Sequence, residues 1–213
     1  MVEVVAAYHG RVRVDVFDIV PEQAGRILDF GGGIGATGAA LKASGRATHV
    51  VLADQVADVL AQGVDHSYAG DLEDLALIER IVDESGPFDT ILCLDILEHL
   101  SDPWSVVQRL HHGLMPGGAL VISLPNVNHW SVVGPLLLKG RFDLADTGVL
   151  DRTHLRWFAK HGVIDLATGT GLVLEAIKHN IFDGRKRRLD RMTFGLLTRF
   201  LALQYVVRVR RKD

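Results

Sequence analysis

Residues 26–54, RILDFGGGIGATGAALKASGRATHVVLAD, decide the fold class of this chain. An apolar run at 26–30 leads into a glycine-rich turn, a helix-compatible segment follows at 37–43, and a second apolar run occupies 49–53. Runs that are apolar at successive positions are typical of parallel strands, because helices cover both of their faces. Two such strands joined by a helix predict a parallel α/β unit.

The same alternation continues along the chain. Further strands are expected at residues 65–68, 88–94, 119–124, 172–180 and 201–210. Further helices are expected at 56–62, 74–84, 103–112 and 160–168, with a basic helical segment before the last strand. Residues 126–152 interrupt this pattern with Gly, Asn, Asp and Pro, so we predict an insertion over the strand ends at about 126–157. A chain of 213 residues favours one domain, 1–213.

Composition narrows the class of protein. Hydrophobic residues at 48% and charged residues at 23% match the globular average and argue against a disordered chain or a coiled coil. One cysteine, Cys93, excludes a disulfide framework and a multi-cysteine zinc module. The N-terminus shows no targeting signal, and the apolar stretch at 194–207 is interrupted by Thr198, Arg199 and Gln204. We therefore expect a cytoplasmic protein, soluble or peripheral.

The net charge of −3 is unevenly distributed. Residues 183–213 carry ten Lys or Arg and three Asp, so the rest of the chain is acidic overall. A basic end on an acidic body predicts an anionic neighbour, either a membrane surface or a phosphorylated substrate. A solvated basic end is the alternative. We do not expect a nucleic-acid partner.

The glycine-rich turn predicts a nucleotide-like ligand, because backbone amides there can approach it closely. The sequence of the turn allows two interpretations of the ligand class. Gly33-x-Gly35-x-x-Gly38 matches the dinucleotide fingerprint, whereas Asp29 followed by Gly31-x-Gly33-x-Gly35 resembles the S-adenosylmethionine (SAM) loop of Rossmann-like methyltransferases. Glycines needed only for tight packing are a third explanation.

Two acids follow at the ends of the next strands. Asp54, with Gln55 beside it, ends the second strand, where an acid hydrogen-bonds ribose hydroxyls in either cofactor class. Asp71 ends the third strand; in SAM enzymes an acid here faces the adenine amino group, and the amide of the next residue, Leu72, meets the ring. Each acid could instead cap a helix. Together with Asp29, these positions favour SAM.

Residues 88–126, FDTILCLDILEHLSDPWSVVQRLHHGLMPGGALVISLPN, resemble the central part of class I SAM-dependent methyltransferases. The resemblance implies a Rossmann-like α/β fold, with a seven-stranded sheet in the order 3-2-1-4-5-7-6, strand 7 antiparallel and helices on both faces. The commoner loop of this family has Cys or Ser where this chain has Gly32, a change that removes no ligand atom.

Residues 140–162, GRFDLADTGVLDRTHLRWFAKHG, look like a subgroup often linked to cell-surface glycan and lipid-carrier gene clusters. That subgroup resembles the ubiquinone-biosynthesis and MetW-like methyltransferases. The resemblance implies methyl transfer from SAM, and we expect the acceptor to be a hydroxyl of a small molecule, a sugar or a lipid-linked glycan. A SAM-fold binding protein without catalysis is one alternative. An NAD-dependent oxidoreductase is another, but the chain has no Tyr-x-x-x-Lys pair.

The end of the fourth strand carries the candidate catalytic residues. An alcohol or phenol acceptor must lose its proton during methyl transfer, which calls for a base or a Lewis-acid metal. Asp95, Glu98 and His99 resemble the metal-binding segment of small-RNA 2′-O-methyltransferases, in which a further His lies downstream of a Pro-Asn pair, as His154 does here. The resemblance implies a divalent metal held by Asp95, Glu98, His99 and His154, with Asp95 also near the cofactor. His99 or His154 as a general base, or a structural role for all of them, are the alternatives.

Overall fold

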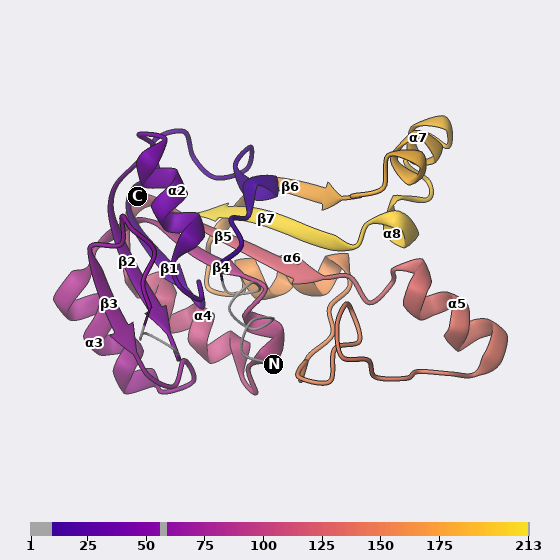
Figure 1. The fold of residues 1–213 in the computed structure, drawn as a ribbon, viewed down its shortest axis with the longest axis horizontal. Helices are drawn as coiled ribbons and strands as arrows, with labels where there is room; N and C mark the ends of the chain where they lie inside the picture. Colours follow the sequence, from indigo (N-terminus) through magenta and orange to yellow (C-terminus); the bar gives the residue numbers. More distant parts are fainter. Residues whose placement is uncertain (1–9, 56–58, 213) are drawn as a thin grey trace.

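The computed structural model describes residues 10–55 and 59–212. A seven-stranded sheet runs through it in the order β3-β2-β1-β4-β5-β7-β6, as the family resemblance implied (Figure 1). Strands β1 to β5 pair in parallel, and β7 pairs antiparallel with both β5 and β6. The strands are β1 (Gly25–Phe30), β2 (Ala47–Asp54), β3 (His66–Ala69), β4 (Phe88–Leu94), β5 (Leu114–Pro125), β6 (Val173–Asn180) and β7 (Gln204–Arg210).

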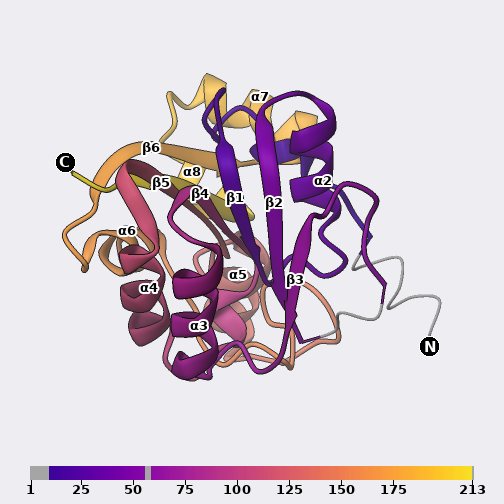
Figure 2. The ribbon, with the colours of Figure 1, turned by 90° about the vertical axis from the view of Figure 1, so that its left-hand side faces the viewer.

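Helices cover both faces of the sheet (Figure 2). One face packs against α3 (Leu75–Ser85), α4 (Pro103–His112) and α6 (Lys160–Thr168). The other face packs against α2 (Ala36–Ala43) and the segment around the short helix η1 (Val14–Val16). Strand β1 supplies Leu28 and Phe30 to the first core and Ile27 to the second, because successive side chains of a strand point to opposite faces.

The helix starts follow from their capping residues. The Asp74 side chain accepts a hydrogen bond from the Ala76 amide at the start of α3. The Asp102 side chain accepts one from the Ser105 amide at the start of α4, where Pro103 has the dihedral angle that a first helical position needs. The helices predicted at these two places are confirmed.

The interruption predicted after β5 contains one helix, α5 (Trp130–Lys139), followed by a long connection to α6. Figure 1 shows α5 projecting from the body of the molecule. Strand β6 then leads into α7 (Gly184–Met192) and α8 (Thr198–Leu201) beyond its carboxyl end. The extent of the domain and of the insertion, 126–157, stays a prediction.

Two expectations concern residues that lie partly or wholly outside the described part of the chain. Of the helix predicted at 56–62, residues 56–58 lie outside the described part, and 59–62 are not helical, so the helix is wrong there. The expectation for the extreme N-terminus concerns residues 1–9, which also lie outside it. Among the residues described, no helix combines the length and apolar character needed to cross a bilayer.

Candidate functional site

The predicted site residues gather at one edge of the sheet. Because β1 to β4 are parallel, their carboxyl ends lie together, and β1 pairs on one side with β2 and on the other with β4. Ligands of such sheets bind in the crevice outside this edge. The glycine-rich turn follows β1, Asp54 ends β2, and Asp95 follows β4.

The glycine-rich turn has the backbone geometry that a close ligand approach requires. Gly31 has φ +75°, and a Cβ atom there would lie 2.4 Å from the Ile96 side chain. At Gly32, the departure from the commoner loop, a Cβ would lie 2.5 Å from the Asp29 carboxyl carbon. Glycine at 32 therefore leaves space for the carboxyl group of a fully buried acid.

Asp29 is hydrogen-bonded to the helix that follows the turn. One of its carboxylate oxygens accepts a hydrogen bond from the Gly38 amide at 3.1 Å. Burial raises the pKa of Asp29 to about 6, the Gly38 hydrogen bond acts in the opposite direction, and the Asp54 charge raises it again. Asp29 thus holds the first part of α2, the helix that follows the turn, and its role toward a cofactor stays a prediction.

Asp54 closes the turn from the neighbouring strand. Its Oδ2 accepts a hydrogen bond from the Gly33 amide at 2.7 Å, and the residue is buried. Gln55 beside it is exposed. The alternative role as cap of a helix from residue 56 finds no support in residues 59–62, which are not helical. Contact of Asp54 and Gln55 with a ribose stays a prediction.

Asp71 and Leu72 follow β3 and differ in burial. Asp71 is exposed and accepts a hydrogen bond from the Glu73 amide, while Leu72 is buried in the core. Asp71 does not cap α3, because Asp74 does. An adenine contact at Asp71 and the Leu72 amide stays a prediction.

Asp95 lies at the centre of a polar network that the sequence did not reveal. Its carboxylate accepts hydrogen bonds from Arg13 Nη1, Ser123 Oγ and Gln204 Nε2. Arg13 also donates to Gln204 and pairs with Asp15. No local motif predicts these partners, because Arg13 is 82 residues from Asp95 and Gln204 is 109. With three donors on its carboxylate, Asp95 is not among the residues whose ligand atoms cluster below.

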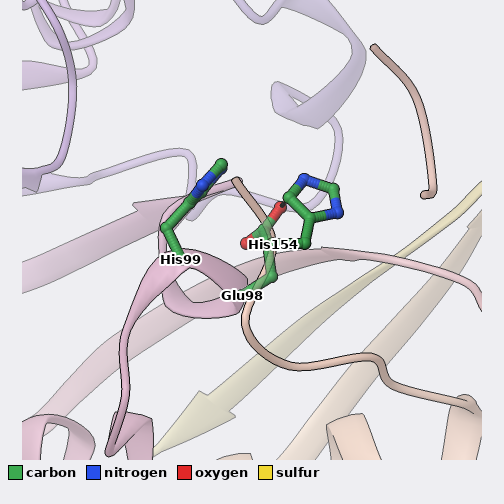
Figure 3. Close-up of side chains that lie close together, drawn as sticks. All are labelled: Glu98, His99 and His154. Atoms are coloured by element: carbon green, nitrogen blue, oxygen red, sulfur yellow. Dashed lines mark ion pairs between the residues drawn. The ribbon is translucent and has the colours of Figure 1, made fainter. Parts of the chain in front are cut away.

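Glu98, His99 and His154 lie together (Figure 3). One ligand atom from each lies within 4.8 Å of the others. Glu98 and His99 come from the single 3₁₀ turn η2 (Leu97–His99) after β4, and His154 comes from the connection before α6. The two imidazole rings are 4.8 Å apart between centroids, and His154 Nε2 is 4.0 Å from Glu98 Oε1. The fold thus brings together His99 and His154, which are 55 positions apart in the sequence and were predicted to share a site.

Both imidazoles present the same nitrogen to this cluster. His99 Nδ1 lies 3.2 Å from the Thr153 carbonyl oxygen, and His154 Nδ1 lies 3.0 Å from the Val149 carbonyl oxygen. A carbonyl oxygen only accepts, so each Nδ1 carries a proton, and in the neutral ring Nε2 keeps its lone pair. Partial burial and the neighbouring His154 lower the pKa of His99, which keeps that ring neutral.

Glu98 is the most unusual group of the cluster. Its residue is 1% exposed, and neither carboxylate oxygen has a hydrogen-bond partner in the described structure. Burial, and secondarily the Asp95 charge, raise the pKa of Glu98 well above its usual range. A buried carboxyl group without partners is costly unless something binds it. A structural role of Glu98 and His99 as caps of α4 is excluded, since Asp102 caps this helix.

These residues line a pocket of about 130 Å³, called the reaction pocket below. Its lining includes Asp95, Glu98, His99 and His154, together with Gln204 and the segment from Thr147 to Val149. The orphaned carboxyl group and two Nε2 lone pairs fit a divalent ion, since Nδ1 hydrogen bonds to backbone carbonyls are what usually orient metal-ligating histidines. They fit equally a pair of imidazole bases.

Comparison with known proteins places this geometry in a family. Residues 8–177 match the family described as a methyltransferase domain. The ubiquinone biosynthesis O-methyltransferase of Xylella fastidiosa (strain 9a5c) is 34% identical over 120 residues, covering 54% of this chain and 48% of that protein. That of Coxiella burnetii (strain Dugway 5J108-111) is 29% identical over 167 residues, 74% of this chain and 70% of that protein. The chain spans about half the length of the Xylella relative.

Solved structures agree on the fold. A SAM-dependent methyltransferase from Mesorhizobium loti has a TM-score of 0.61 at 16% identity, covering 92% of this chain and 96% of that one. One from Archaeoglobus fulgidus has a TM-score of 0.62 at 15% identity, covering 97% and 94%. These likenesses show the sheet and its order, while the family match extends over most of the sequence. The chain belongs to the methyltransferase domain family, whose methyl donor is SAM.

Proposed function

We propose that this chain is a SAM-dependent O-methyltransferase whose acceptor hydroxyl enters the reaction pocket. The observation that carries the proposal is the Glu98 carboxyl group, buried without a partner beside two imidazole Nε2 atoms at the carboxyl edge of the sheet. The O-methyltransferase names of the Xylella and Coxiella relatives support an oxygen acceptor. SAM would bind along the edge at Gly31, Gly33, Asp54, Gln55, Asp71 and Leu72, with Asp95 between it and the acceptor.

In this reaction the protein has two main tasks: it positions the acceptor against the methyl group of SAM, and it removes the proton of the acceptor hydroxyl. The acceptor oxygen attacks the methyl carbon of SAM, the carbon–sulfur bond breaks, and its electron pair returns to sulfur, giving S-adenosylhomocysteine. The hydroxyl proton passes to a neutral Nε2 of His99 or His154, which their Nδ1 hydrogen bonds orient toward the pocket. The network of Arg13, Ser123 and Gln204 fixes Asp95 at the wall between the two substrates.

The same residues would hold a divalent ion. Glu98, His99 and His154 are the proposed ligands; Asp95, counted with them from the sequence, has its carboxylate engaged by three donors. When bound, an ion would lower the pKa of the acceptor hydroxyl. Titration with Mn²⁺, followed by its electron paramagnetic resonance signal, tests the set: we expect saturable binding that Glu98→Gln and His154→Gln each weaken. Full methyl transfer after chelation would leave the imidazoles as bases alone.

The proposed acceptor is a small molecule, a sugar or a lipid-linked glycan. Contact with an anionic membrane is supported by exposed apolar side chains beside the basic helix α7. Phe194 is 94% exposed and Leu196 78%, and Arg185, Lys186 and Arg188 precede them. Apolar and basic groups together are typical of surfaces that lie in the lipid interface.

Two measurements test the proposed function. Calorimetric titration with SAM, S-adenosylhomocysteine and NAD separates the cofactor classes: we expect the first two to bind and NAD not to. Mass spectrometry of a cell extract incubated with isotopically labelled SAM then identifies the methylated product. Binding of SAM without any labelled product, in an extract that contains the acceptor, would favour a binding protein without catalysis.

A further inference from the structure

A second pocket lies at the same edge of the sheet, beyond the carboxyl end of β6. It has a volume of about 490 Å³, within the range of small-molecule sites, and is called the distal pocket below. Asp15 and Asp18 of the N-terminal segment and residues 178–182 of β6 and the following turn form its floor. Arg187, Asp190 and Arg191 of α7 and Thr198 of α8 form its wall.

Most of the carboxylates in the distal pocket already have cationic partners. Asp18 pairs with Lys178, and Asp15 pairs with Arg13 and accepts a hydrogen bond from Asn180. Asp190 accepts a hydrogen bond from the Thr198 hydroxyl. These contacts hold the floor and the wall in a fixed arrangement, and Lys178 and Arg13 offset the charge of two of the three carboxylates.

The two arginines of the wall differ from these groups. Within residues 10–55 and 59–212, neither Arg187 nor Arg191 forms an ion pair with a carboxylate, and Arg187 only donates to the Ile181 carbonyl. They are four positions apart on α7, so their side chains share one helix face, the one that lines the pocket. Three further basic residues of α7, Arg185, Lys186 and Arg188, add positive potential nearby.

The distal pocket lies on the other side of β7 from the reaction pocket. Strand β7 separates them: its first residue, Gln204, pairs with Pro125 of β5 on one side and with Asn180 of β6 on the other. Two strand spacings of about 4.8 Å each therefore separate the ends of β5 and β6. Arg13 bridges the same gap, because it contacts both Asp95 of the reaction pocket and Asp15 of the distal pocket.

We propose that the distal pocket binds a phosphoryl group of the acceptor through Arg187 and Arg191. Guanidinium groups match the geometry of phosphate oxygens and form bidentate bonds with them. An acceptor that lies along the carboxyl edge of the sheet would place its phosphate here and its reacting hydroxyl at His99 and His154. The placement of the reacting hydroxyl at His99 and His154 rests on the proposed function, whereas the binding of phosphate does not.

The test measures binding of inorganic phosphate and of glucose 1-phosphate to the full chain by calorimetry. Arg191 is exposed and has no hydrogen bond to lose, so Arg191→Gln leaves the fold intact, which thermal melting by circular dichroism checks. Arg188→Gln is the matched control, because it removes the same charge from the same helix outside the pocket lining. We expect Arg191→Gln to weaken phosphate binding at least fivefold and Arg188→Gln less than twofold.

Two outcomes overturn the proposal. An equal loss in both variants would mean diffuse attraction to a basic helix, and the absence of saturable binding at millimolar phosphate would mean no site. Tighter binding of glucose 1-phosphate than of dihexanoyl phosphatidic acid indicates a soluble acceptor, and the reverse indicates a lipid-linked one. The same variants are also titrated with S-adenosylhomocysteine. A failure of the proposed function would appear as a lack of S-adenosylhomocysteine binding, while a failure of the phosphate site would appear only in the phosphate titration.

Discussion

Glu98 shows how a residue of the proposed site can lower the stability of the fold. Its carboxyl group is buried and has no hydrogen-bond partner in the described structure, and burial raises its pKa well above the ordinary value of 4.5. When the pH rises above about 4.5, the carboxyl group ionises in the unfolded chain while it stays protonated in the folded one. The unfolded state then binds fewer protons, so the free energy of unfolding falls as the pH increases.

Glu98→Gln should remove this pH dependence. Without metal, we expect the variant to unfold at higher urea than the wild type at pH 7 and at nearly the same urea at pH 4, because glutamine has the same shape and no charge. Parallel urea titrations at the two pH values measure the effect. Asp83→Gln, on an exposed turn of α3, is the control that should leave the difference between the two pH values unchanged. An identical pH profile for Glu98→Gln and wild type would contradict the assignment.

Asp54 is the second residue whose role can be isolated. Asp54→Ala would remove a charge-assisted bond to the ribose and should weaken SAM binding by about 1.5–3 kcal/mol. Because Asp54 also accepts the Gly33 amide hydrogen bond, Asp54→Asn is the necessary control: it retains an acceptor for the turn and loses the charge. Calorimetry with SAM should rank wild type above Asn and Asn above Ala. Unchanged SAM affinity in a folded Ala variant would remove Asp54 from the site.

At the scale of the element, the turn after β1 depends on both its backbone and its neighbours. Gly31 and Gly45 have similar positive φ angles, +75° and +78°, but a Cβ at 31 would collide with Ile96, whereas one at 45 would meet nothing within 4 Å. Gly31→Ala should therefore cost about 1–3 kcal/mol more than Gly45→Ala, from overpacking alone. Urea denaturation of the two variants gives this difference directly, and SAM titration should show a loss in the first only. Equal stabilities would mean that Ile96 moves aside freely.

The sequence predicted individual helices and strands better than any other feature of the structure. Strands such as residues 88–94 are continuously apolar, and helices such as α3 and α4 begin at acids that cap them, so pattern and chemistry agree locally. The segment at 59–62 lacked such agreement and is not helical. Asp95, Glu98, His99 and His154 were predicted because strand ends and a family motif mark them, and the last three lie together in the structure.

Other parts of the site had no local signal. Arg13 and Gln204 reach Asp95 only because the N-terminal segment crosses the sheet edge and β7 inserts between β5 and β6. The ion pair and hydrogen bonds at Asp95 are consequences of tertiary structure. The distal pocket is another, since its floor brings together Asp15 and Lys178, which are 163 positions apart in the sequence.

At the scale of the whole molecule, the exposed apolar groups after α7 predict a peripheral membrane contact. Replacing Arg185, Lys186 and Arg188 by Glu should abolish partition into vesicles with anionic lipid, and Phe194→Ser with Leu196→Ser should weaken it as well. Sedimentation with vesicles of phosphatidylglycerol and phosphatidylcholine measures the bound fraction. Val59→Ser, which changes another exposed apolar side chain elsewhere, is the control. Wild-type protein that stays in the supernatant would leave these groups as a solvated surface.

The position of β7 has a consequence for how the molecule is made. It is the last strand in chain order, yet it fills the gap between β5 and β6, which are both synthesised earlier. Until residues 204–210 leave the ribosome, two strand edges stand open and can pair with other chains. Nascent chains stalled before Gln204 should therefore aggregate, and both pockets should form in a single late step when the final strand closes the sheet.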